Sequence, residues 1–113
     1  MPKKRYSYHA SNPLDRNSIL SRGLLPGKQA SFGPPAVYLF RFQLFAENYT
    51  SDYPMDVWKV DMKGIHVEPD PEDPQAAVYT EHPISRKRLK LIGTFHEGEE
   101  VNQVDVEKFE EEA

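Results

Sequence analysis

Apolar and polar positions in the first quarter of the chain predict one strand followed by one capped helix. Residues 5–9 alternate two tyrosines with two polar residues, which is the period of a half-buried strand. Asn12 suits a helix N-cap, Pro13 the first helical position, and Asp15 the acid expected in a first turn. Gly23 stands where such a helix ends. We therefore expect a strand over residues 5–9 and a helix between Asn12 and Gly23.

The later apolar segments predict a second helix and four more strands. Residues 36–40, "AVYLF", form a run typical of a buried strand, and apolar residues recur at helical spacing over 42–49. Further strands are expected at 56–62, 76–81 and 89–95. Residues 66–75 alternate prolines with acids, which predicts an extended, exposed loop. This order of elements predicts an α+β domain whose two helices come early.

Composition limits the class of protein. A chain of 113 residues with 12% aromatic residues is long enough for one domain with a modest core. It has no cysteine, which excludes a disulfide scaffold, a thiolate zinc site and a cysteine nucleophile. No apolar run approaches the roughly 20 residues of a membrane-spanning helix. We therefore expect a cytoplasmic protein with no membrane partner.

The net charge of −4 conceals two regions of opposite sign. Residues 1–96 carry 13 Lys/Arg and 10 Asp/Glu, a balance of +3, whereas residues 97–113 carry eight acids and one base, a balance of −7. We predict a single domain over 1–96 and an acidic C-terminal tail over 97–113. The tail is expected to be a solvated end or a short helix, and the alternative is that it folds back over a basic groove.

Three stretches, in their order and spacing, resemble the small ADP-ribosyltransferase-like fold of the His–Tyr–Glu type. They are "YHASNPLDRNSILSRGLLPG", "AVYLF" and "YTEHPISRKRLKLI", and together they span roughly residues 5–95. The chain is also similar to the related RNA 2′-phosphotransferases. The resemblance implies a small split sheet, mixed or antiparallel, and an enzyme that uses NAD as its substrate. Such an enzyme cleaves the nicotinamide–ribose bond and transfers ADP-ribose to a protein, a nucleic acid or a small molecule.

The resemblance also implies roles for particular residues. Glu81, His9 and Tyr38 are the implied catalytic residues. Cleavage passes through an oxocarbenium-like state, which the Glu81 carboxylate would stabilise against the ribose. Tyr38 would stack on the nicotinamide, and a neutral His9 would bond a ribose hydroxyl. Further NAD contacts are implied for the Ala10 backbone and for the side chains of Ser11, Asn12, Lys28 and Arg41.

Other interpretations of these positions remain open. A strand-end histidine, a tyrosine in an apolar strand and a carboxylate before a proline turn all have ordinary structural roles. The protein is alternatively a non-catalytic binding or regulatory module that docks a partner through "SRKRLK" (85–90) or the acidic tail. An RNA 2′-phosphotransferase-like activity is the remaining alternative. The four histidines have no paired metal-ligand spacing, so no metal is expected.

Overall fold

The computed structural model describes residues 5–27, 35–49 and 52–101. Its strands are β1 (Tyr6–Ser11), β2 (Val37–Phe40), β3 (Met55–Asp61), β4 (Glu68–Pro69), β5 (Ala77–Thr80), β6 (Leu89–His96) and β7 (Glu99–Val101). Its helices are α1 (Arg16–Arg22) and α2 (Gln43–Glu47), with 3-10 turns η1 (Pro13–Asp15) and η2 (Arg86–Arg88). Both predicted helices and all five predicted strands are present, with bounds that differ by a few residues.

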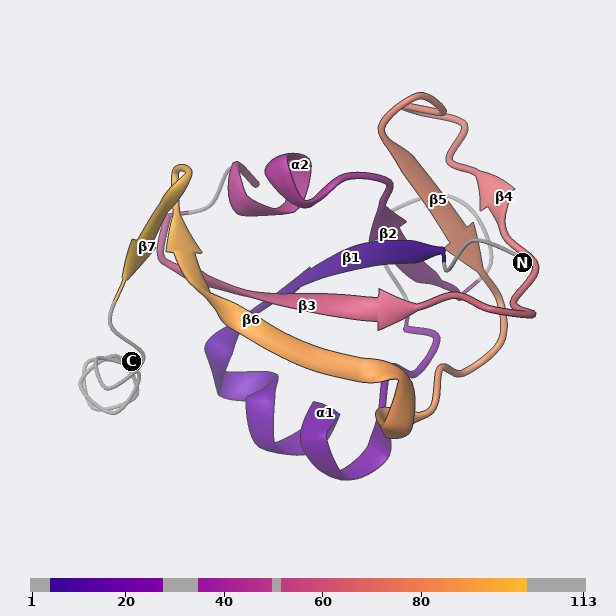
Figure 1. Ribbon diagram of the computed structural model, residues 1–113, viewed down its shortest axis with the longest axis horizontal. Helices are drawn as coiled ribbons and strands as arrows, with labels where there is room; N and C mark the ends of the chain where they lie inside the picture. The colour runs from indigo at the N-terminus through magenta and orange to yellow at the C-terminus, as the bar shows by residue number, and fades with distance from the viewer. Residues whose placement is uncertain (1–4, 28–34, 50–51, 102–113) are drawn as a thin grey trace.

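The seven strands form one sheet in the order β4-β5-β2-β1-β3-β6-β7. The strand pairs are antiparallel, which confirms the α+β prediction and resolves the mixed-or-antiparallel alternative. Figure 1 shows α2 above this sheet and α1 below it. Within the described ranges, no helix has the length and apolar character needed to cross a bilayer.

Each face of the sheet has its own apolar cluster. The larger cluster joins α1 to the sheet and consists of the buried residues Ile19, Leu24, Val37, Leu39, Trp58, Val60, Met62, Val78 and Ile84. The smaller one lies beneath α2 and consists of Ala46, Val57 and Phe95, with Tyr8, Phe40 and Ile92 packed against it. Because successive side chains of a strand point to opposite faces, these clusters show which residues face α1 and which face α2.

Local signals explain why α1 begins and ends where it does. The Asn12 side chain accepts a hydrogen bond from the Leu14 N–H at 3.0 Å, which caps the η1 turn that leads into α1. Gly23 ends α1 with φ of 78°, and an added Cβ there would overlap the Ile84 carbonyl. Leu24 and Ile84 then exchange backbone hydrogen bonds of 2.9 Å. Glycine is therefore required for both the conformation and the close approach.

Two predictions need correction at the edges of the sheet. The expected loop over 66–75 contains β4, a two-residue edge strand that pairs with β5 and tolerates its proline because it lies at the edge. The expected boundary after His96 falls within a hairpin, since Glu97 and Gly98 turn the chain into β7, which pairs with β6. The sheet therefore extends to Val101, and the rest of the acidic tail lies outside the described residues.

β1 is paired very differently on its two sides. All six of its residues pair with β3, whereas Tyr8 and Phe40 form its one register pair with β2. β2 in turn pairs with β5 over four residues. The sheet is therefore joined continuously on the β3 side of β1 and at a single position on the β2 side.

Candidate functional site

The β1–β2 ladder stops before Ala10, so the backbone groups of Ala10 point at β2 although the two do not pair. The Met62 N–H donates to the Arg5 carbonyl at 2.9 Å, so odd-numbered residues in this part of the chain direct their backbone groups at β3. The N–H and C=O of Tyr8 and Ala10 therefore point at β2. Tyr8 has its partner there, but the register does not continue to Ala10 and Tyr38. We call this place, Ala10 opposite Tyr38, the unpaired position.

The His9 side chain forms a hydrogen bond with the Tyr38 carbonyl, a backbone group of β2 beyond the last pair of the β1–β2 ladder. His9 Nδ1 lies 2.8 Å from the Tyr38 carbonyl oxygen, and because a carbonyl only accepts, Nδ1 is the protonated nitrogen. Burial lowers the pKa of His9 below its usual 6.5, against the opposing effects of this bond and of Asp15, so the ring is neutral at neutral pH. Among the described residues, no fully buried side-chain nitrogen lacks a partner. In this tautomer Nε2 of His9 is the hydrogen-bond acceptor.

Tyr38 is placed on the other face of the sheet from His9. Tyr38 shares the α2 face with Phe40, two residues along β2, whereas His9 lies opposite Trp58 on the α1 face. The Tyr38 ring is half-buried and lies 5.8 Å from the ring of Tyr79, its partner in β5, at a tilt of 38°. The structure thus connects His9 and Tyr38 through a backbone carbonyl, and their rings face opposite sides.

Glu81 lies one residue beyond the end of β5. Its neighbour Thr80 is buried and pairs with Val37 of β2, and the Thr80 hydroxyl accepts from the His82 N–H at 3.3 Å. The Glu81 side chain is exposed. The three predicted catalytic residues therefore come from β1, from β2 and from the end of β5, which are neighbouring strands in the sheet.

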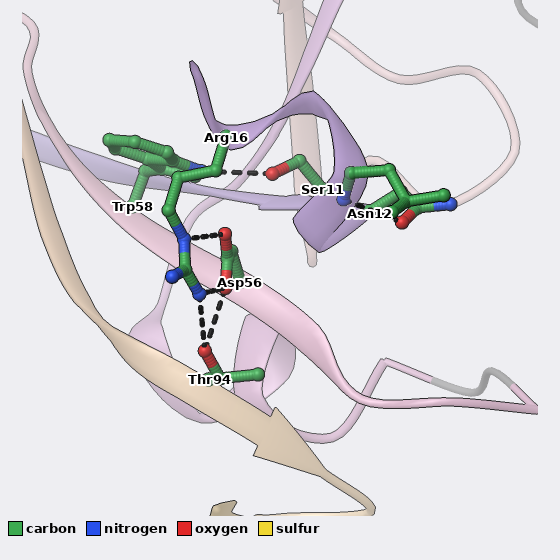
Figure 2. A network of polar contacts seen from close by, with 7 residues as sticks. Ser11, Asn12, Arg16, Asp56, Trp58 and Thr94 are labelled. Carbon is green, nitrogen blue, oxygen red and sulfur yellow. Dashed lines mark hydrogen bonds and ion pairs between the residues drawn. The ribbon is translucent and has the colours of Figure 1, made fainter. Parts of the chain in front are cut away.

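Ser11 and Asn12 make structural contacts at the end of β1. The Ser11 hydroxyl accepts a hydrogen bond of 2.9 Å from the indole nitrogen of Trp58 (Figure 2). Besides capping η1, Asn12 donates through Nδ2 to the Tyr53 hydroxyl at 3.2 Å. These bonds hold the end of β1 against β3 and the turn before it, which is a different role from the NAD contacts that the resemblance implies.

Of the two cations for which NAD contacts are implied, the structure describes Arg41. Arg41 follows the last residue of β2, and its Nε donates to the Pro74 carbonyl at 3.0 Å. The Arg41 guanidinium therefore holds the connection between β4 and β5. Lys28 lies outside the described residues.

Sequence reasoning missed a buried ion pair that fixes the start of α1 on the sheet. Arg16 donates through Nε and Nη2 to the two carboxylate oxygens of Asp56, at 2.8 and 2.6 Å. The Thr94 hydroxyl donates to the same carboxylate at 2.7 Å (Figure 2). Asp56 is fully buried, and it lies two residues before Trp58, on the same core face of β3. An acidic residue within an apolar strand was the signal in the sequence that could have indicated this pair, because buried carboxylates require a cationic partner.

Among the described residues, no group of three His, Asp or Glu side chains is placed to hold a metal ion. Comparisons of the chain with family models, curated proteins and solved structures find no match. A functional assignment therefore depends on the geometry of the unpaired position and on the sequence resemblance.

Proposed function

We propose that this protein is an NAD-dependent ADP-ribosyltransferase-like enzyme that binds the nicotinamide group at the unpaired position. The observation that carries the proposal is the backbone of Ala10, whose N–H and C=O point at β2 beyond the last pair of the ladder. A carboxamide offers one acceptor and two donors, so it complements this pair of groups as a neighbouring strand would. The methyl side chain of Ala10 lets a ligand approach closely.

Aromatic side chains beside Ala10 support the same ligand. Ala10 and Tyr38 both lie on the α2 face, where the half-buried Tyr38 and Tyr79 rings are close to each other. A nicotinamide bonded to Ala10 would stack against these rings in an offset arrangement. His9 faces the other side of the sheet, and its Nε2 is the acceptor that we propose for a ribose hydroxyl.

The proposed chemistry requires a carboxylate, for which Glu81 is the candidate. As the bond between nicotinamide and ribose breaks, positive charge develops on the sugar and the bonding electrons leave with nicotinamide. A carboxylate that holds the ribose 2′-hydroxyl stabilises this charge electrostatically. The acceptor then attacks the anomeric carbon and loses its proton, which completes the transfer of ADP-ribose.

Release of nicotinamide from NAD is the direct test of this activity. We expect Glu81→Gln to lower the rate at least about a hundredfold, as removal of one electrostatic stabiliser does. Its free energy of unfolding should stay within about 0.5 kcal/mol of wild type, because the side chain is exposed. Glu72→Gln, which neutralises another exposed carboxylate, is the matched control. Absence of NAD binding at millimolar concentration in calorimetry would reject the proposal.

The position of the carboxamide is tested separately by NMR. Nicotinamide should shift the Ala10 amide resonance, because that N–H would donate to the carboxamide oxygen. Nicotinic acid lacks the carboxamide donor that the Ala10 carbonyl requires, and we expect it to bind at least about tenfold more weakly, since an unmet buried polar group costs about 1–3 kcal/mol. Equal affinity for the two compounds would place the ligand elsewhere.

A further inference from the structure

Lysine and arginine residues from separate segments gather where β3 ends and β6 begins. This basic surface consists of Arg5, Lys59, Lys63, Arg86, Lys87, Arg88 and Lys90. The Arg88 guanidinium donates to the carbonyls of Asp61 and Lys63, at 3.0 and 2.8 Å, and so holds η2 against the turn after β3. Residues more than 20 positions apart in sequence thereby form one positively charged region.

Two of these lysines face each other across adjacent strands. Lys59 of β3 and Lys90 of β6 are register partners, and directly opposed like charges destabilise a sheet. The Lys59 ammonium lies 4.1 Å from the centroid of the Tyr6 ring, which is 36% exposed. This contact of a cation with an aromatic ring compensates one lysine only in part. An anion bound between the two lysines would relieve their repulsion.

Among the described residues, the charge of the basic surface is not balanced by ion pairs. Within the part of the chain that the structure describes, the ion pairs are Arg16–Asp56 and His66–Glu68, and neither involves this surface. Asp61 lies beside the surface, and its carboxylate accepts the Lys63 N–H at 3.0 Å. A cluster of seven cations creates a positive potential that attracts polyanions.

We propose that the basic surface binds single-stranded nucleic acid. Its lysines and arginines would contact successive phosphates, and the exposed Tyr6 ring would stack on a base. Cations combined with an exposed aromatic ring are the features that single-strand recognition requires, whereas an acidic protein segment would need the cations alone. None of these residues belongs to the proposed NAD site, so the two proposals stand or fall separately.

Fluorescence anisotropy of a labelled 12-nucleotide oligouridine, measured with the full chain at several salt concentrations, tests the role of the lysines. The double variant K59Q/K90Q should weaken binding by about tenfold or more and reduce the slope of log affinity against log salt by about 1.4, or about 0.7 for each lost phosphate contact. K59R/K90R keeps both charges and should bind within about twofold of wild type. Equal loss in both variants, or no binding to wild type at low salt, would overturn the proposal.

Tyr6 distinguishes nucleic acid from an acidic protein partner. Tyr6→Leu should weaken oligouridine binding by about fivefold or more through loss of stacking, whereas Tyr6→Phe should retain affinity. Unchanged affinity in Tyr6→Leu, or equal competition by polyglutamate of the same charge, would show that the surface binds polyanions without recognising bases. If Tyr6→Leu does not fold, R86Q/K87Q at the exposed η2 turn should weaken binding as K59Q/K90Q does. Unchanged affinity there would also reject the proposal.

Discussion

The two sides of β1 differ in how completely the strand is paired. Toward β3, every residue of β1 has a partner, and a buried hydrogen bond between Ser11 and Trp58 reinforces the pairing. Toward β2, one pair forms, and His9 bonds a carbonyl that the ladder leaves. One strand is thus fixed in place along its whole length on one side, while the ladder on its other side stops after a single pair.

The largest expected effect comes from breaking the β3 side. Asp56→Ala removes the buried partner of Arg16 and of Thr94, and loss of one member of a buried pair typically costs 3–5 kcal/mol. Because the Arg16 side chain is 17% exposed and would be partly solvated, we expect about 3 kcal/mol, near the lower end of that range. Urea unfolding measures this change. Asp52→Ala, at an exposed position, should stay within about 0.5 kcal/mol of wild type.

Amide hydrogen exchange compares the two sides without any substitution. The Ser11 N–H points at β3 within a continuous ladder, whereas the Ala10 N–H points at the unpaired position. Ala10 should therefore exchange on the order of a hundredfold faster than Ser11. Equal protection at the two amides would mean that the β1–β2 ladder is closed in solution and that Ala10 is not available to a carboxamide.

A smaller effect is expected when the bond between Ser11 and Trp58 is removed. Ser11→Ala leaves the indole N–H of Trp58 buried without an acceptor, which should cost about 1–3 kcal/mol in thermal or urea unfolding. Ser7→Ala is the matched control, because Ser7 is buried on the same face of the same strand. Similar losses in both variants would mean that burial of the hydroxyl, rather than the bond to Trp58, is what matters.

The smallest expected effect is a pH dependence that arises on the β2 side. Burial lowers the pKa of His9 in the folded state, so below about 6.5 the unfolded chain binds a proton that the folded chain does not. The contribution of neutral His9 to the free energy of unfolding is fully present above pH 6.5, and it is lost as the pH falls toward the folded-state pKa. His9→Asn keeps a donor for the Tyr38 carbonyl but does not titrate. Between pH 7.5 and pH 5.5, the free energy of unfolding should therefore decrease more in wild type than in His9→Asn. Equal decreases in the two proteins would contradict this assignment.

Local signals in the sequence were sufficient to predict most of the elements. The cap at Asn12 and the helix end at Gly23 depend only on residues close to them in the sequence. The helix between them is therefore recognisable from the local sequence alone. The strand around residues 36–40 is recognisable from its run of apolar side chains. β4 was missed because its pairing with β5, and not the local sequence, makes residues 68–69 a strand.

The candidate site depends on pairings that local sequence does not specify. The resemblance selected His9 and Tyr38, and they do lie on neighbouring strands. That they face opposite sides follows from the Tyr8–Phe40 register, and a shift of one residue would reverse it. The pair of Arg16 and Asp56 joins positions 40 residues apart in sequence, and only the acid on an apolar strand indicated it.

β7 pairs with the last three residues of β6, Thr94 to His96, so residues 89–93 have no partner on that outer side among the described residues. An open strand edge of this kind can recruit the edge of a second molecule and begin aggregation. Lys90 places a charge on that edge, beside the cations of η2, and charged side chains are a common protection of strand edges against such pairing. We therefore expect neutralisation of the cations at this edge to favour association of the protein with copies of itself.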